Sequence, residues 1–276
     1  MLAERIILAL ALVLPIAAAR ADGPLAQTAP QTPAALSASA PAARRLRTEV
    51  LATYPHDTGA FTQGLLLHEG FLYESAGNYG SSTLRKVEVE SGKVARRLEL
   101  PPQLFGEGLA LVGKELVQLT WREGAALVYD LSSFEKIRQL SYTGEGWGLC
   151  FDGQWLIMSD GSDHLFVRDP KTLATWRRVP VTLDGRPLGQ LNELECVGDS
   201  VYANVWNTDS IVEIDKQSGA VRSLIDAAGL LSPAERASLH PHAVLNGIAR
   251  DAATDTFLVT GKFWPKLFRV KFAAEH

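Results

Sequence analysis

A short motif recurs five times along this chain of 276 residues: a pair of residues, usually Gly-Leu, that opens a short apolar run. The copies are Gln63-Gly64-Leu65, Glu107-Gly108-Leu109, Trp147-Gly148-Leu149, Asn192-Glu193-Leu194 and Asn246-Gly247-Ile248. Their middle positions lie 44, 40, 45 and 54 residues apart, a period typical of propeller blades rather than of helical repeats. In such an array one residue per repeat occupies an equivalent place in space. The residues that precede the five pairs therefore form a ring.

The segments between these motifs indicate strands. From about Arg44 the chain consists of short apolar runs separated by Gly, Asp and Asn. Each of the first four repeats shows four such runs, which is the content of one propeller blade. The sequence therefore predicts an all-β fold, a five-bladed β-propeller with four-stranded blades. A helical pattern is expected only between Pro233 and Leu239.

The last repeat lacks a strand, because the chain ends soon after its third run, Leu267 to Phe272. A well-alternating run, Arg47 to Tyr54, precedes the first repeat and belongs to none. We expect this N-terminal strand to close the last blade as its outermost strand, which removes exposed sheet edges. An independent β-arm or a sixth, incomplete blade remains the alternative.

The first residues resemble a secretory signal peptide over residues 1–21, with a basic residue, an apolar run and an Ala-x-Ala cleavage site. Residues 22–43 are rich in Ala and Pro and predict a disordered linker, which leaves residues 44–276 as the five-bladed β-propeller domain. The apolar run is too short for a stable membrane anchor after cleavage. We therefore expect an exported protein, periplasmic or secreted, and a monomer.

Charge and scattered motifs exclude several functions. The net charge of −4 gives no excess of positive charge of the kind that binds nucleic acid. Gly108-x4-Gly113-Lys114 falls short of a phosphate-binding loop because Glu115 follows it, and His240 with His242 favours a surface loop over a metal site. The two cysteines, Cys150 and Cys196, lie on first strands of consecutive repeats, either as a disulfide or as two buried thiols.

The ring of equivalent positions is the candidate site. It contains one carboxylate, Glu107, among the amides Gln63, Asn192 and Asn246 and the indole of Trp147. Trp121, Trp206 and Lys262 follow the second strands of their repeats and point toward the same mouth, as do Phe61 and Phe105. Aromatic walls with a few placed polar groups are typical of a ligand pocket.

Several of these motifs occur together in a known order. The quoted segments include Phe61-Thr62-Gln63-Gly64-Leu65, Phe105-Gly106-Glu107-Gly108, Glu145-Gly146-Trp147-Gly148-Leu149, Leu191-Asn192-Glu193-Leu194-Glu195, Ala203-Asn204-Val205-Trp206 and Val259-Thr260-Gly261-Lys262. Over about residues 47 to 272 the chain resembles the plant and bacterial glutaminyl-peptide cyclotransferases, or glutamine cyclotransferases. Arg250 stands where that family commonly has an aromatic residue.

The resemblance implies an acyltransferase of the aminoacyl type that converts N-terminal glutamine of peptides or proteins to pyroglutamate with release of ammonia. By resemblance and by position, Glu107 is expected to be the general acid/base. Lys262, Asn192 and Gln63 are expected to bind the amide and carbonyl oxygens. Phe61, Phe105, Trp121, Trp147 and Trp206 are expected to pack against the glutamine methylenes.

No cofactor is expected to be required for catalysis and no catalytic metal is expected, although the sequence leaves a structural calcium open. Two other functions stay open. A calcium-dependent, lactonase-like hydrolase would use the oxygens of Glu107, Asn192 and Asn246 as ligands. A non-catalytic propeller that binds a protein partner would need no carboxylate in the channel.

Overall fold

The structure, a computed structural model, describes residues 42–275 and is rich in β-strands, with almost no helix in that range. The all-β prediction is confirmed. The first two repeats contain β2 (Thr62–His68), β3 (Phe71–Ala76), β4 (Thr83–Glu88) and β5 (Val94–Glu99), then β6 (Gly106–Val112), β7 (Glu115–Thr120), β8 (Ala125–Asp130) and β9 (Lys136–Ser141). The third contains β10 (Leu149–Phe151), β11 (Leu156–Met158), β12 (His164–Arg168) and β13 (Thr175–Pro180).

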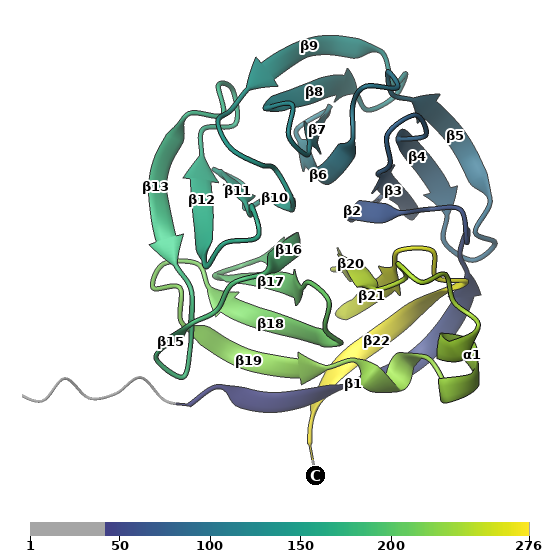
Figure 1. Cartoon of the computed structure of the whole chain (residues 1–276), viewed down its shortest axis with the longest axis vertical. Helices are drawn as coiled ribbons and strands as arrows, with labels where there is room; N and C mark the ends of the chain where they lie inside the picture. Colours follow the sequence, from purple (N-terminus) through teal and green to yellow (C-terminus); the bar gives the residue numbers. More distant parts are fainter. Residues whose placement is uncertain (1–41, 276) are drawn as a thin grey trace, which may run out of the picture. The chain divides into compact units, whose positions relative to one another are not determined.

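The remaining strands belong to the last two repeats. These are β16 (Leu191–Val197), β17 (Ser200–Val205), β18 (Ser210–Asp215), β19 (Val221–Asp226), β20 (Leu245–Asp251), β21 (Thr256–Gly261) and β22 (Lys266–Ala274), with a small hairpin of β14 (Thr182–Leu183) and β15 (Arg186–Pro187) before β16. Within each repeat the successive strands pair antiparallel. The four-stranded units lie around a common centre in Figure 1.

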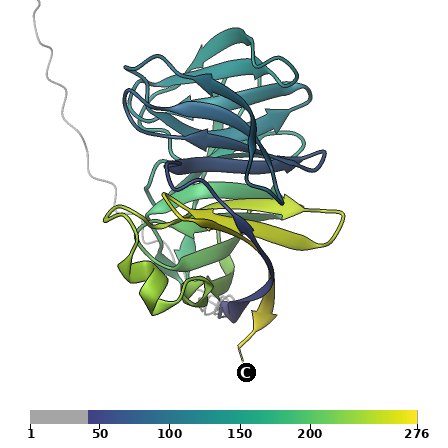
Figure 2. The same ribbon diagram turned by 90° about the vertical axis from the view of Figure 1, so that its right-hand side faces the viewer.

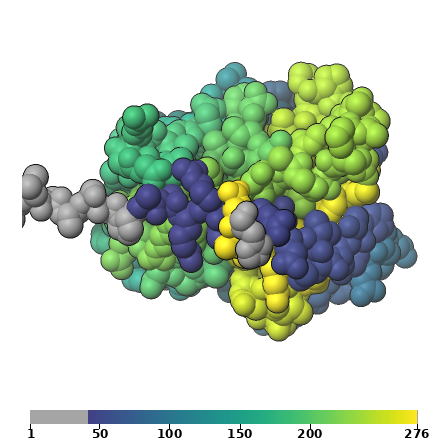
Figure 3. All heavy atoms as spheres, turned by 90° about the horizontal axis from the view of Figure 1, so that it is seen from below, coloured from purple at the N-terminus to yellow at the C-terminus, as the bar shows by residue number. Residues whose placement is uncertain are grey.

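The N-terminal strand β1 (Arg44–Pro55) closes the last repeat as predicted. It pairs antiparallel with β22 along nearly its whole length, and the two strands run together in Figure 2. One pairing was not predicted: the first four residues of β1 also pair in parallel with β19 of the fourth repeat. This contact joins the last two units into one eight-stranded sheet, and Figure 3 shows β1 at the surface beside β22.

The innermost strands form a closed circle in which β2, β6, β10, β16 and β20 are each in contact with the next, and β20 with β2. Glycine permits this approach. A Cβ added to Gly108 would lie 2.5 Å from the backbone nitrogen of Leu149, and one added to Gly148 would lie 2.0 Å from the carbonyl oxygen of Asn192. The recurring glycine is therefore required by packing at the centre.

The apolar core is divided among the interfaces between neighbouring units. Five buried clusters occur, and each combines side chains from two adjacent repeats. One example is the packing of Leu84 from the first repeat with Leu116 from the second. Since no unit buries its own faces alone, the circle must close for any unit to be stable.

The link between the fourth and fifth repeats carries the only helices among the described residues, η1 (Ala228–Leu230) and α1 (Pro233–Ala237). A helix was expected here, and α1 begins with a capping box in which the Ser232 side chain accepts a hydrogen bond from the Glu235 amide. Within residues 42–275 no helix is long and apolar enough to cross a membrane. The predicted signal peptide and nearly all of the predicted linker lie outside the described residues.

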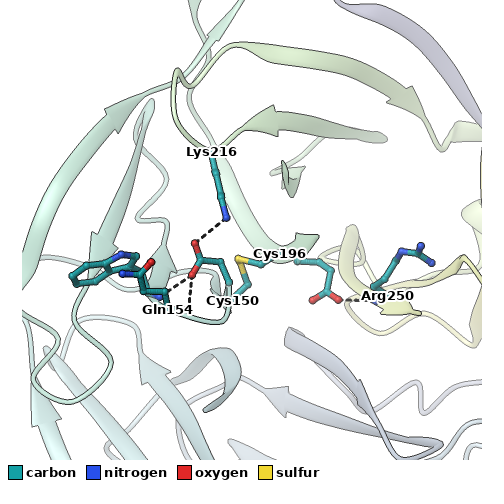
Figure 4. The surroundings of a disulfide bond; sticks show 8 residues. Cys150, Gln154, Cys196, Lys216 and Arg250 are labelled. Atoms are coloured by element: carbon teal, nitrogen blue, oxygen red, sulfur yellow. Dashed lines mark hydrogen bonds and ion pairs between the residues drawn. A yellow bond between two sulfur atoms is a disulfide. The ribbon is translucent and has the colours of Figure 1, made fainter. Parts of the chain in front are cut away.

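Cys150 and Cys196 form a disulfide that links β10 to β16, with 5.5 Å between their Cα atoms (Figure 4). The sequence was compatible with either a disulfide or two buried free thiols, and the structure contains the disulfide. It joins the innermost strands of neighbouring repeats, 46 residues apart in the chain. The bridge therefore reinforces the central circle at the position where β10 is only three residues long.

Candidate active site

A cavity of about 330 Å³ opens at one end of the central circle. Its lining is Phe61, Gln63, Asn78, Phe105, Glu107, Trp121, Trp147, Asn192, Trp206 and Lys262. The structure thus brings together all nine candidate residues taken from the sequence, and adds Asn78. Asn246, the fifth member of the sequence-derived ring, is buried but does not line the cavity.

A local irregularity of the innermost strands aims the polar side chains at the cavity. In three repeats the pairing between the first and second strands shifts register near the start of the first strand. The shifts occur at Gln63, at Glu107 and at Asn192. Such bulges re-aim a side chain and are common beside active sites. The repeated sequence motif therefore marks a repeated bulge, which explains why equivalent residues meet at one place.

Glu107 is the single carboxyl group in the cavity lining, and its residue is only 4% exposed. Its Oε1 accepts a hydrogen bond of 2.9 Å from Nε2 of Gln63. Burial raises the pKa of Glu107 well above its usual range, the charge of Lys262 opposes that effect, and the charges of Glu145 and Glu123 add to it. A buried carboxyl group with a raised pKa is a candidate for general acid/base catalysis.

Asn246 fixes the orientation of the Gln63 side chain through a hydrogen bond. Nδ2 of Asn246 donates to Oε1 of Gln63 at 3.3 Å and to the backbone oxygen of Thr62 at 2.9 Å. These bonds orient the Gln63 amide so that its nitrogen faces Glu107. Gln63 therefore contacts the candidate acid directly, a geometry that the sequence did not reveal.

Lys262 is also only 4% exposed, and its Nζ lies 4.5 Å from the centre of the Phe61 ring. Burial lowers the pKa of its ammonium to about 8, with the charge of Glu107 opposing. No carboxylate within residues 42–275 forms an ion pair with Lys262, so the ring of Phe61 is its close partner. An ammonium without a fixed counter-ion is available to a negatively charged oxygen in the cavity.

Asn192 presents an acceptor that has no partner. Its Oδ1 is buried and makes no hydrogen bond within the described part of the chain. A buried polar atom without a partner costs free energy, and at a cavity wall the cost is offset when a ligand supplies a donor. The geometry suits an N–H group of a bound molecule.

Aromatic side chains form the walls in two groups. The Phe105 ring lies 6.0 Å from Phe61 and 5.5 Å from Trp121, whereas Trp147 packs edge-on against Trp206 at 5.6 Å. Trp206 is 40% exposed, which places it at the mouth. The walls are therefore largely apolar, and water is displaced when a ligand fills the space.

A buried ionic network around His56 was not found from the sequence. Nδ1 of His56 lies 2.8 Å from the backbone oxygen of Trp264, and Nε2 lies 3.2 Å from Oε1 of Glu74. Both partners are acceptors, so the ring carries two protons. Although burial lowers the pKa of His56, the charge and hydrogen bond of Glu74 raise it overall. Glu74 also accepts from the hydroxyl of Thr62, so this network ties the start of β2 to the loop after Lys262.

Two further acids of β16 bond to the backbone of neighbouring inner strands. In the fourth repeat Glu193 replaces the glycine, and its carboxyl accepts from the backbone amides of Leu65 at 3.2 Å and Ile248 at 2.7 Å. Oε1 of Glu195 accepts from the backbone amide of Arg250 at 2.8 Å (Figure 4). The sequence shows both acids, but only the structure shows that they bind neighbouring strands rather than the cavity.

Glu195 should make the stability of the fold depend on pH. Burial raises its pKa to about 8, from about 4.3 in an unfolded chain. Because the folded state binds this proton more tightly, Glu195 contributes most to the free energy of unfolding at pH values below its pKa in the unfolded chain. That contribution is lost as pH rises toward 8, by up to about 1.4 kcal/mol per pH unit. We expect Glu195→Gln to flatten the dependence between pH 5.5 and 7.5 in urea unfolding. Equal slopes for the two proteins would contradict this.

The central cavity of this all-β chain holds one buried carboxyl group and one buried ammonium between aromatic walls, an arrangement typical of enzyme pockets for small ligands. The glutamine cyclotransferase family matches residues 24–272, and the chain belongs to this family. It is 40% identical over 225 residues to a glutaminyl-peptide cyclotransferase of Arabidopsis thaliana, covering 81% of this chain and 70% of that protein. It is also similar to the crystal structure of Myxococcus xanthus glutaminyl cyclase, with a TM-score of 0.80 and 39% identity, covering 85% of this chain and 100% of that one.

The resemblance found from the motifs is therefore confirmed. Other cavity-related residues escaped the sequence reading for definable reasons. In the first repeat Gly77 holds the place that Trp121 and Trp206 hold in theirs. Asn78 lies one position further along the chain, so the repeat pattern does not point to it. His56 and Glu74 carry no repeat signal, since their partners come from distant parts of the chain.

Proposed function

We propose that this protein cyclises N-terminal glutamine of peptides or proteins to pyroglutamate and releases ammonia, as an acyltransferase of the aminoacyl type. The five four-stranded units are the blades of a β-propeller, and the cavity at its centre takes the substrate glutamine. The observation that carries the proposal is the buried Glu107 carboxyl facing the same cavity as the buried Lys262 ammonium. A cavity of about 330 Å³ suits one side chain and its amino group, at the small end of ligand sites.

The reaction is intramolecular. The neutral α-amine of the substrate attacks its own side-chain amide carbon, which forms the ring nitrogen–carbon bond and places negative charge on the amide oxygen. Since both groups belong to one residue, binding need only select the folded-back conformation. The site must then move one proton and stabilise one oxygen.

Glu107 moves the proton. Its carboxylate takes a proton from the attacking nitrogen and returns it to the amide nitrogen, so that the carbon–nitrogen bond breaks and neutral ammonia leaves. The hydrogen bond from Gln63 fixes the carboxyl group for both steps. The raised pKa of Glu107 brings its proton affinity closer to that of the substrate amine, which has an unperturbed pKa of about 7.7–8.0.

Lys262 and Asn192 hold the substrate. The ammonium of Lys262 stabilises the negative oxygen of the tetrahedral intermediate, and the unpaired Oδ1 of Asn192 accepts an N–H of the α-amine. Gln63 contributes through Glu107 and through its remaining amide hydrogen. Packing of Phe105, Trp121, Trp147, Trp206 and Phe61 around the methylenes excludes the water that would hydrolyse the amide instead.

The disulfide supports the proposal that the protein is exported to the periplasm or secreted. Stable disulfides form in oxidising compartments and are rare in the cytosol. The Cys150–Cys196 bond lies on two central strands, where a reducing environment would remove a link between neighbouring units.

The direct test is an assay on a dipeptide that begins with glutamine, following ammonia and pyroglutamate together. We expect equal amounts of both, no product from the same dipeptide with an acetylated amine, and no loss of turnover with a chelator, because no step uses a metal. Inactivation by the chelator at a temperature where the fold survives would favour the calcium-dependent hydrolase. Absence of product from the unblocked dipeptide would favour a binding protein.

A further inference from the structure

One carboxylate outside the cavity lining contacts two of the cavity's tryptophans. Oε2 of Glu145 accepts a hydrogen bond of 2.8 Å from Nε1 of Trp121 and one of 3.0 Å from Nε1 of Trp147. Trp121 follows β7 of the second repeat and Trp147 precedes β10 of the third. A single oxygen thus joins two neighbouring units at the mouth.

Arg122 completes the arrangement. Its Nε donates to Oε1 of Glu145 at 2.9 Å, and its guanidinium lies 3.7 Å from the centre of the Trp121 ring. Burial raises the pKa of Glu145, but hydrogen bonds from Trp147, Trp121 and Arg122 outweigh it, so that the pKa stays below its usual range. The group is therefore a carboxylate throughout the neutral range, and both of its oxygens accept hydrogen bonds.

The backbone fixes Glu145 in turn. The amide of Gly146 donates to the carbonyl of Trp121 at 2.9 Å, and the amide of Trp147 donates to the carbonyl of Ser159 at 3.0 Å. The acceptor therefore stands on a segment that is itself bonded to both repeats. Trp121 and Trp147 then pack against Phe105 and Trp206, respectively, so the order imposed by Glu145 extends to most of the aromatic wall.

We propose that Glu145 is a positioning residue for the reaction, which fixes the rings of Trp121 and Trp147 and so sets the width of the substrate entrance. The proposal rests on the proposed function for its kinetic consequence, but the placement of the two indoles is a property of the protein alone. The negative charge of Glu145 has a second effect, because it helps to raise the pKa of Glu107.

Two substitutions separate hydrogen bonding from charge. Glu145→Ala removes the acceptor and the charge. Glu145→Gln removes the charge but keeps an amide oxygen, whose two lone pairs can accept from both indoles. We expect the alanine variant to raise KM for a glutamine dipeptide by about tenfold or more, the loss expected for a charge-assisted hydrogen bond, with a smaller change in kcat. The glutamine variant should keep KM within about threefold and shift the acid limb of the pH profile of kcat to lower pH, because Glu107 loses a neighbouring negative charge.

A matched control is available on the second repeat, which also carries Trp121. Glu115 lies at the opposite end of β7, pairs with Arg138, and has a side chain 31% exposed, against 37% for Glu145. Glu115→Ala should leave KM, kcat and the near-UV circular dichroism unchanged. Glu145→Ala should change that spectrum, because two of the six tryptophans lose their fixed orientation.

The outcomes separate this inference from the proposed function. A wild-type protein without cyclase activity would overturn the proposed function, and the near-UV spectrum of Glu145→Ala would still test the positioning role. An active wild type with unchanged KM and spectrum in Glu145→Ala would overturn the inference. Equal damage in the glutamine and alanine variants would also overturn it, since the retained acceptor would then be irrelevant.

Discussion

Glu107→Gln should lower turnover of a glutamine dipeptide by between about a hundredfold and ten-thousandfold, the range for loss of a general acid/base. The amide keeps the size of the side chain and an oxygen that can accept from Gln63, so the cavity keeps its shape. It cannot carry the proton from the attacking nitrogen to the leaving one. Binding should therefore change little, and a substrate analogue should retain its affinity in calorimetry.

Glu115→Gln is the control for that substitution. Glu115 is bonded through both oxygens to Arg138, away from the cavity, so its replacement removes a partly exposed ion pair worth at most about 1 kcal/mol of stability and no catalytic group. A folded Glu107→Gln protein with near-full cyclisation would show that the buried carboxyl group is structural. The assignment of the general acid/base would then be wrong.

The grouping of the nine candidate residues around one cavity was predictable because the fold is repetitive. A residue that recurs at a fixed place in each repeat must recur at a fixed place in the ring, so Gln63, Glu107 and Asn192 could be grouped without any knowledge of distances. The bulge at each of these positions then turns the side chains inward. The repeat supplied the long-range information that a single sequence normally lacks.

Features outside the repeat were missed for the same reason. The parallel pairing of β1 with β19 depends on how far the N-terminal strand extends beyond the blade that it closes. Glu145 has no counterpart at the equivalent place of other repeats, and its role depends on two indole nitrogens meeting at one oxygen. Contacts of this kind follow from side-chain directions, which the spacing of residues does not encode.

For Glu193 the sequence predicted the position of the residue but not the role of its side chain. The sequence placed it among the glycine positions, and the structure confirms that its backbone belongs there. Where glycine lets neighbouring strands approach closely in other repeats, the carboxyl group of Glu193 instead accepts hydrogen bonds from the backbone amides of Leu65 and Ile248. Burial raises the pKa of Glu193 well above its usual range, and the charge of Glu195 adds to this. A perturbed pKa therefore marks a structural acid here, and the distinction from Glu107 is access to the cavity.

Lys262→Met should reduce kcat/KM by about a hundredfold to a thousandfold, the loss expected for one donor to a developing oxyanion. Methionine has a similar length and remains in contact with Phe61, but it cannot stabilise the negative oxygen. We expect KM to rise as well as kcat to fall, because the proposed role has the ammonium in contact with the amide oxygen both before and during the reaction. Lys86→Met is the matched control, since Nζ of Lys86 also lies over a phenylalanine ring, that of Phe71 at 4.0 Å, far from the cavity.

The pH dependence distinguishes loss of charge from loss of packing. Burial lowers the pKa of Lys262 to about 8, so its ammonium loses the positive charge as pH rises through that value. The substrate amine, with an unperturbed pKa of about 7.7–8.0, becomes neutral and reactive over the same range. The wild type should therefore show a narrow optimum, and Lys262→Met should lose the basic limb and rise to a low plateau. The variant should also unfold at a higher temperature at pH 7, because it no longer buries a charge without a fixed counter-ion. A retained basic limb near pH 8 in Lys262→Met would assign that limb to another group and remove Lys262 from the reaction.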